Sequence, residues 1–137
     1  MPAPGFEAFD QNKNLITNRD FSGRVVVLDF WFTGCGACFR KFPQLQKIYE
    51  QYRNHPAVTV LAVNKPVDGD KEWQAFQMIR EDGYSFPVVI AKDEKMIDSL
   101  GIEHYPTTVL INKHGKVVFK GGIEKVEKYL DELIAEK

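Results

Sequence analysis

The stretch from Arg24 to Phe32 is almost continuously Val, Leu, Phe and Trp, and Asp29 is its single acidic interruption. A run this apolar is typical of a strand buried on both faces, as in a parallel sheet. From Cys35 onward the apolar positions recur in steps of four and three, which predicts an amphipathic helix. Those positions are Cys38, Phe42, Leu45, Tyr49 and Tyr52.

Shorter patterns of the same two kinds fill the rest of the chain. The turn-rich sequence "DQNKN" between two apolar pieces predicts a small hairpin near the start, and "NKHG" predicts a second one near the end. Further strands are predicted at 58–63, 86–91, 107–111 and 116–120, and helices at 70–82, 93–101 and 123–134. Strands that alternate with helices, followed by a hairpin and a helix, predict an α/β fold whose mixed central sheet is covered on both faces.

Two of the predicted helices have recognisable ends. The helix at 70–82 would place Trp73, Phe76 and Ile79 on one face and stop at Gly83. The helix at 93–101 would begin at Asp93 as its N-cap and close at Gly101.

Length and composition narrow the class of protein. The 137 residues are 44% hydrophobic and 27% charged, which is typical of a single soluble globular domain spanning 1–137. The net charge of -1 gives no reason to expect nucleic acid as a partner. No apolar run approaches the roughly 18 residues of a membrane span. The first residues lack a signal-peptide pattern, so we expect a cytoplasmic protein or one whose leader is absent from this sequence.

The only two cysteines, Cys35 and Cys38, stand where the buried strand gives way to the helix. Two cysteines are too few for a disulfide scaffold, and their close spacing indicates chemistry. Cys35 would lie among the free N–H groups that begin the helix, which stabilise a thiolate. Cys38 would lie on the same side, close enough to form a disulfide with little backbone movement. Asp29 would face the space beneath the second sulfur, unless it is exposed at the edge of the strand.

The sequence "DFWFTGCGAC", with Pro43 in the following helix, resembles the thioredoxin superfamily. "GIEHYPTTVLINKHGKVV" is similar to the segment around the cis-proline of that family, here Pro106. The stretch from Val63 to Pro87 is similar to the insertion of the extracytoplasmic TlpA-like and cytochrome-maturation branch. The resemblance implies a thioredoxin-like fold with an N-terminal hairpin or extension at 1–20 and an insertion at 64–87.

The resemblance also implies the roles of several residues. The catalytic group would consist of Cys35 as nucleophile, Cys38 as the buried resolving thiol and Asp29 as the acid beneath it. The substrate-binding group would consist of Pro106, Tyr105, Trp31 and Gly34. Within it, Tyr105 would present its backbone to the bound partner chain, and Trp31 would border the site.

Three positions depart from the family pattern. Gly34 stands where the family usually has Trp before the first cysteine, which changes the surface that meets a partner. Ala37 stands where Pro is frequent, and Asp29 stands where the TlpA-like branch often has Asn. Because Gly36 and Ala37 bring no charge between the cysteines, we expect a weakly stabilised thiolate and hence a reducing pair.

A C-x-x-C pair can also bind zinc or attach haem. A zinc site needs two more ligands, and the only histidines, His55, His104 and His114, are scattered along the chain. Haem attachment needs a histidine directly after the second cysteine, where this chain has Phe39.

The sequence therefore predicts a protein thiol–disulfide oxidoreductase that exchanges with protein thiols or disulfides as a reductant. An upstream electron donor would reduce its cysteine pair again. It would need no metal or organic cofactor, because the cysteine pair carries the two electrons, and it would be a monomer. By resemblance it would work in the periplasm or cell envelope, with the cytoplasm as the alternative. The competing hypothesis is a thioredoxin-fold binding module that docks an extended chain along the Pro106 edge without turnover.

Overall fold

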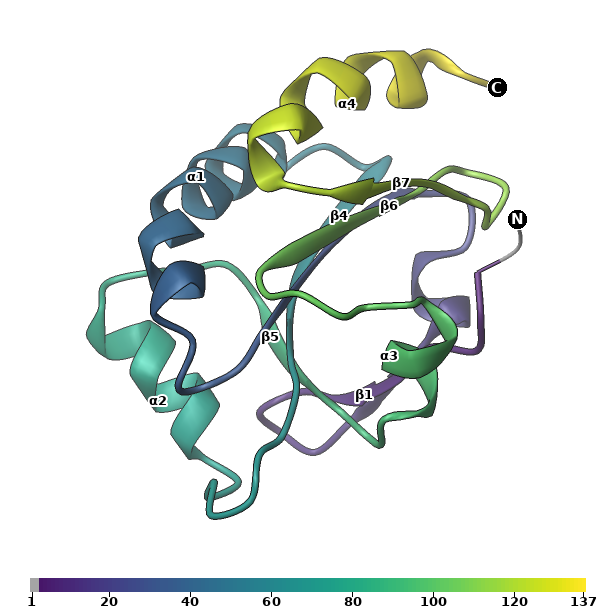
Figure 1. Cartoon of the computed structure of the whole chain (residues 1–137). Coiled ribbons are helices and arrows are strands. Elements are labelled where there is room, and N and C mark those ends of the chain that lie inside the picture. Colours follow the sequence, from purple (N-terminus) through teal and green to yellow (C-terminus); the bar gives the residue numbers. More distant parts are fainter. Residues whose placement is uncertain (1–2) are drawn as a thin grey trace.

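The computed structural model describes residues 3–137, which form one seven-stranded sheet with helices packed against it (Figure 1). The first two residues of the predicted N-terminal segment lie outside the described residues. The strands are β1 Glu7–Phe9, β2 Leu15–Thr17, β3 Val25–Trp31, β4 Val58–Asn64, β5 Val88–Ala91, β6 Thr107–Ile111 and β7 Val117–Gly121. The α-helices are α1 Gly36–Tyr52, α2 Gln74–Glu81, α3 Lys95–Ser99 and α4 Val126–Ala135, and 3₁₀ turns lie at Asn18–Phe21 and Ile123–Lys125.

The sheet is mixed, with strand order β2-β1-β5-β4-β3-β6-β7. Strand β4 runs parallel to β3 and to β5, whereas β6 pairs antiparallel with both β3 and β7. The β1–β2 hairpin is present, and β1 joins the sheet by pairing antiparallel with β5. The predicted α/β fold with a mixed sheet is confirmed.

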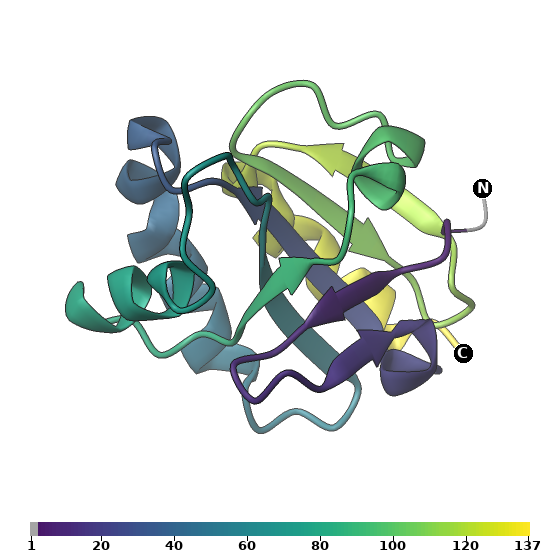
Figure 2. The ribbon, with the colours of Figure 1, turned by 90° about the horizontal axis from the view of Figure 1, so that it is seen from below.

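Helices cover both faces of this sheet (Figure 2), and the sheet separates two hydrophobic cores. Buried side chains of α1, α2 and α4 pack in one core, and those of α3 pack with the N-terminal segment in the other. Within residues 3–137, no helix is long and apolar enough to cross a membrane.

Strand β3 lies in the middle of the sheet, and all seven of its residues are buried. Val25, Val27 and Trp31 belong to the core beneath α1, whereas the apolar residues that alternate with them belong to the opposite core, namely Val26, Leu28 and Phe30. Because successive side chains of a strand point to opposite faces, Asp29 points toward the α1 side. The strand thus carries its one carboxylate into the layer that also holds both cysteines.

Helix α2 begins four residues later than the sequence predicted. Asp70 lies in a turn before the helix, where its carboxylate accepts hydrogen bonds from the Thr33 hydroxyl at 2.8 Å and from the Val67 N–H at 3.1 Å. Trp73 is the N-cap residue and its side chain is 56% exposed, so the prediction that it shares one helix face with Phe76 and Ile79 was wrong. Asp70 therefore bonds to Thr33, which is distant in the sequence, and the first turn of the predicted helix does not form.

The start of α3 differs from the prediction by one residue. Glu94 occupies the N-cap position and makes no capping hydrogen bond through its side chain. Asp93 nevertheless accepts the N–H of Lys95 at 3.0 Å, so its carboxylate still satisfies one free donor of the first turn. Gly101 follows the helix with φ +68°, a conformation that favours glycine.

Candidate active site

The two cysteines form a disulfide at the amino end of α1, directly after the central strand. Cys35 is the N-cap residue of the helix, and the two Cα atoms are 5.3 Å apart. The N–H of Cys38 donates a hydrogen bond to the sulfur of Cys35 at 3.1 Å. Cys35 is 5% exposed and Cys38 is fully buried, so the first sulfur is the more accessible of the two.

Asp29 is buried, with only 1% of its surface exposed, so the alternative of an exposed position at the strand edge is wrong. Its Oδ1 accepts a hydrogen bond from the Thr108 hydroxyl at 3.0 Å. Its Oδ2 has no hydrogen-bond partner among residues 3–137. Burial raises the pKa of Asp29 from 3.8 to about 7, and the hydrogen bond from Thr108 opposes that rise. Near neutral pH the carboxyl is therefore able both to accept and to release a proton.

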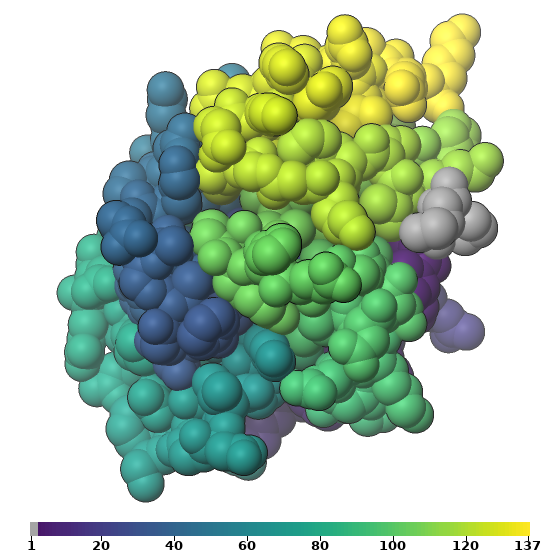
Figure 3. Space-filling view, viewed as in Figure 1, coloured from purple at the N-terminus to yellow at the C-terminus, as the bar shows by residue number. Residues whose placement is uncertain are grey.

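The segment before β6 borders the disulfide region on the surface. In the space-filling view the dark-blue start of α1 lies against the green segment that precedes β6 (Figure 3). The peptide bond between Tyr105 and Pro106 is cis, and both residues are partly buried. The Tyr105 ring packs edge-on against Phe32, with ring centroids 5.3 Å apart, which places this segment beside the loop that leads to Cys35.

Tyr105 is also surrounded by charged groups. The Nζ of Lys65 lies 5.8 Å from the centre of the Tyr105 ring and 3.8 Å from a carboxylate oxygen of Glu94. Burial raises the pKa of the Tyr105 hydroxyl, and the negative charges of Glu94 and Asp98 raise it further. The hydroxyl therefore stays protonated at neutral pH.

Trp31 does not fit its expected role in substrate binding. Its side chain is fully buried and packs edge-on against Phe39 and Phe42, with ring centroids 5.8 and 5.4 Å away. A partner protein cannot reach a ring enclosed in this way, so Trp31 is a core residue beside the site. Gly34, in contrast, is exposed, and a Cβ added there would meet only the Phe32 ring, at 3.6 Å.

The structure adds two residues that the sequence analysis missed. Arg40 places a guanidinium nitrogen 3.5 Å from where a Cβ on Gly36 would lie, so a cation stands over the turn between the cysteines. The four-residue spacing from Gly36 to Arg40 on a helix is a signal that was available in the sequence. Thr108 is the second, and nothing in the local sequence pairs it with Asp29.

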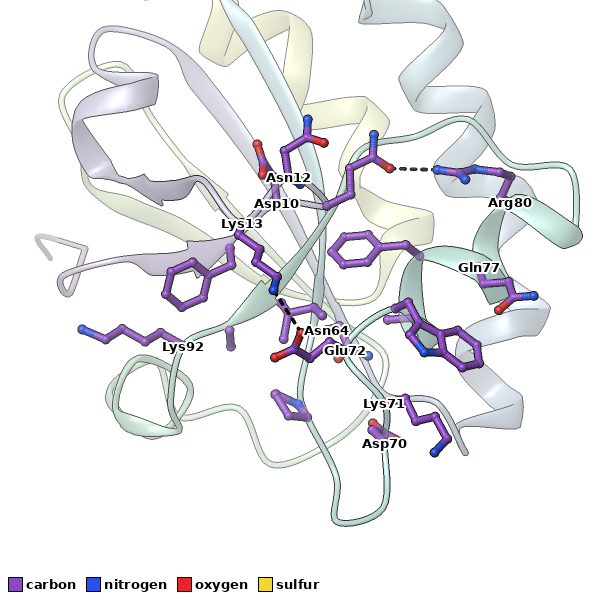
Figure 4. A pocket seen from close by; sticks show the side chains of 18 of the residues that line it. Asp10, Asn12, Lys13, Asn64, Asp70, Lys71, Glu72, Gln77, Arg80 and Lys92 are labelled. Atoms are coloured by element: carbon purple, nitrogen blue, oxygen red, sulfur yellow. Dashed lines mark hydrogen bonds and ion pairs between the residues drawn. The ribbon is translucent and has the colours of Figure 1, made fainter.

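A separate hollow lies between the β1–β2 turn and the start of α2 (Figure 4). Two contacts join its sides: an ion pair between Lys13 and Glu72 at 3.5 Å and a hydrogen bond from Arg80 to Gln11 at 2.8 Å. Asn64 lines it from the end of β4, and its Nδ2 has no partner among the described residues. Neither cysteine lines this hollow, so it is distinct from the disulfide site.

No group of three or more His, Cys, Asp or Glu residues within 3–137 is arranged to hold a metal ion. The histidines stay apart, and the Nδ1 of His55 is used to accept the N–H of Ala57 at 3.1 Å.

A disulfide at the start of a helix, a buried acid on the preceding strand and a cis-proline beside them define a thioredoxin-like protein of the thiol–disulfide exchange class. A sequence model described as the AhpC/TSA family matches residues 1–120, so the chain belongs to that thioredoxin-like family. The predicted superfamily is thereby confirmed.

Curated relatives agree with this class. The thiol-disulfide oxidoreductase ResA of Halalkalibacterium halodurans is 35% identical over 133 residues, covering 94% of this chain and 73% of the relative. ResA of Bacillus subtilis is 34% identical over 116 residues, covering 85% of this chain and 63% of the relative. The chain thus spans about two thirds of the length of these relatives. Their shared name and the Cys35–Cys38 pair support thiol–disulfide exchange and an oxidoreductase activity.

Solved structures show the same fold. The thioredoxin domain of a thiol-disulfide oxidoreductase from Bacteroides vulgatus has a TM-score of 0.82 at 25% identity, covering 97% of this chain and 96% of that chain. A thiol:disulfide interchange protein from Bacteroides sp. has a TM-score of 0.80 at 28% identity, covering 95% of this chain and 88% of that chain.

Proposed function

We propose that the protein reduces disulfides of partner proteins by exchange through Cys35 and Cys38, with Asp29 handling a proton. The observation that carries this proposal is the difference between the two sulfurs of the bridged pair. Cys35 is the more accessible and accepts an N–H at the helix start, whereas Cys38 is fully buried. A nucleophile needs access and a stabilised thiolate, and a resolving thiol needs neither until the first bond has formed.

The reaction balances without any further redox group. The thiolate of reduced Cys35 attacks one sulfur of the partner disulfide, whose bond breaks and releases one partner sulfur. The thiolate of Cys38 then attacks the sulfur of Cys35, which forms the internal disulfide and releases the second partner sulfur. The partner gains the two electrons that the cysteine pair loses. The released partner thiolates take up protons from solvent, and the proton of Cys38 passes to Asp29.

Asp29 supplies the base for the second step. Cys38 must lose its proton in a buried layer, and Asp29 is the carboxylate that points into that layer from β3. With a pKa of about 7, the carboxyl is partly ionised at neutral pH and accepts that proton. When the pair is reduced again, Asp29 returns the proton to Cys38.

The partner chain docks beside Cys35, along the edge formed by Gly34, Tyr105 and Pro106. Gly34 is exposed and leaves the approach to Cys35 open, and the segment of Tyr105 lies against the loop before Cys35. Backbone groups beside Pro106 pair with an extended partner segment, a form of strand addition.

The partners are proteins that carry a disulfide, and an upstream donor of electrons restores the dithiol. We place the protein outside the cytoplasm, because its sequence resembles the extracytoplasmic TlpA-like branch. For a reducing pair, equilibration with glutathione should give a potential nearer about -270 mV than about -120 mV. A value above about -150 mV would contradict the reducing direction.

Reduction of insulin by dithiothreitol tests the function. The protein at micromolar concentration should accelerate the appearance of insulin precipitate, and the Cys35→Ser variant should leave the background rate unchanged. A binding module that only docks an extended chain would give no acceleration. Equal rates with and without the protein would therefore reject the exchange activity in favour of docking.

A further inference from the structure

Thr108 and Asp29 face one another across two neighbouring strands. They are direct partners in the antiparallel pairing of β3 with β6, and each is only 1% exposed. The Thr108 hydroxyl donates to Oδ1 of Asp29 at 3.0 Å. The other carboxylate oxygen, Oδ2, has no partner among the described residues. The two oxygens of one buried carboxyl group are therefore in different situations.

This difference has a chemical consequence. A hydroxyl that donates its one hydrogen to a carboxylate oxygen favours the ionised carboxylate and occupies that oxygen. A proton arriving from elsewhere meets Oδ2, whose lone pairs are free. Without the hydroxyl, both oxygens would be buried without a donor, and the neutral acid would be favoured more strongly.

We infer that Thr108 is a positioning residue of the exchange reaction: it holds Oδ1 of Asp29 and leaves Oδ2 as the oxygen that takes the proton of Cys38. The inference rests on the proposed role of Asp29 as the base for Cys38. As Cys38 attacks, its proton moves to Oδ2, the Cys35–Cys38 bond forms and the bond from Cys35 to the partner sulfur breaks. When the pair is reduced again, the proton returns from Oδ2 to the Cys38 sulfur.

Thr108 is the hydrogen-bond donor to Asp29, and the other elements packed around the carboxyl contribute the following groups. From β4 the paired residue is Ala62, and the buried residues of α4 are apolar. The titratable groups that α1 contributes to this core are the two cysteines and the phenols of Tyr49 and Tyr52, and the Tyr52 hydroxyl donates to Asp131 at 3.0 Å. Burial raises the pKa of Asp29, and the hydrogen bond from Thr108 opposes that rise.

The test compares Thr108→Val, which keeps the shape but removes the hydroxyl, with Thr108→Ser, which keeps the hydroxyl. Thr59→Val is the matched control, because Thr59 is a strand threonine whose hydroxyl contacts Arg24 far from the site. Each protein is trapped as a mixed disulfide on Cys35 with a small thiol, and the release of that thiol by Cys38 is followed against pH.

We expect Thr108→Val to shift the midpoint of this pH profile upward by about 0.5–1 pH unit and to slow release at pH 7 about three- to tenfold. Thr108→Ser and Thr59→Val should stay within twofold of the wild-type rate at the wild-type midpoint. If Thr108→Val does not fold, Thr108→Ala provides a second variant without the hydroxyl. We expect it to shift the midpoint in the same direction. An unshifted midpoint in the variants that lack the hydroxyl, or an equal shift in Thr108→Ser, would overturn the inference.

The Asp29→Asn variant separates this inference from the proposed function. If Asp29→Asn releases the thiol at the wild-type rate and midpoint, the role of Asp29 itself is wrong. If Asp29→Asn is slow but Thr108→Val keeps the wild-type midpoint, only the role of Thr108 is wrong. In the double variant Asp29→Asn, Thr108→Val, the second change should add no further shift, because the titrating group is already gone.

Discussion

The backbone N–H of Cys38 donates a hydrogen bond to the sulfur of Cys35, 3.1 Å away, within the first turn of α1. Cys38, the proposed resolving thiol, thus donates its backbone N–H to the same Cys35 sulfur that its own sulfur attacks in the second step. Such a donor favours negative charge on the Cys35 sulfur once the disulfide is opened.

Replacing each cysteine in turn should give two different failures. Cys35→Ser should show no turnover above background, because a serine hydroxyl is not ionised near neutral pH. Cys38→Ser should accumulate a mixed disulfide with a protein substrate, because no thiol remains to release it. Intact-protein mass spectrometry of the reaction distinguishes the two. If alkylation of the reduced native protein modified Cys38 before Cys35, the assignment of roles would be reversed.

Arg40 should tune the reactivity of Cys35 through its charge. Its guanidinium lies over the turn between the cysteines, but the residue is exposed, so solvent and salt weaken its effect. We expect Arg40→Ala to slow alkylation of Cys35 about twofold at pH 7 and low salt, and about 1 M salt to remove most of that difference. Lys47→Ala, an exposed cation further along the same helix, is the control. An unchanged rate at low salt in Arg40→Ala would rule out the charge effect.

Asp29 should make the stability of the oxidised protein depend on pH. Because burial raises its pKa from 3.8 to about 7, the native state holds a proton between these values that the unfolded state has released. The free energy of unfolding should therefore fall by about 1.4 kcal/mol per pH unit from about pH 4 to pH 7, and this contribution should level off above pH 7. Denaturant titrations of the disulfide form across this range measure the slope.

Two variants decide whether that slope belongs to Asp29. Asp29→Asn should remove it and raise the stability at neutral pH, because no buried charge then remains. Asp68→Asn, at an exposed aspartate, should leave it unchanged. A slope that persists in Asp29→Asn would assign the pH dependence to another group.

Gln46 should stabilise the fold well beyond an ordinary surface residue. From α1 its Oε1 accepts the N–H of Ser85 at 2.9 Å and that of Phe86 at 3.2 Å. Gln46→Ala would leave both donors without this acceptor, and we expect a loss of about 1–2 kcal/mol in the free energy of unfolding. Gln51→Ala, whose side chain makes one long contact of 3.4 Å with the Tyr52 hydroxyl, should cost less than about 0.5 kcal/mol. Equal losses in denaturant titrations of the two variants would contradict this expectation.

The parts of the site that follow from local sequence were predictable. The unbroken apolar run of β3 and the change of period at Cys35 place the cysteines at a junction of strand and helix, because both patterns depend on near neighbours only. The pairing of Asp29 with Thr108 was not predictable, because it depends on the register between strands 79 residues apart. The exposed position of Trp73 was missed for a similar reason, since the preceding Asp70 bonds to a hydroxyl 37 residues away.

The hydrogen bond from Thr33 to Asp70 also links the disulfide site to segment 64–87. Segment 64–87 is fastened through Asp70 to the loop that carries Cys35, and through Ser85 and Phe86 to the helix that carries Cys38. A shortened chain without this segment would leave Thr33 and Gln46 without those partners on either side of the disulfide. Segment 64–87 therefore supports the disulfide site directly. Grafting the site onto another protein would require this segment as well as the two cysteines.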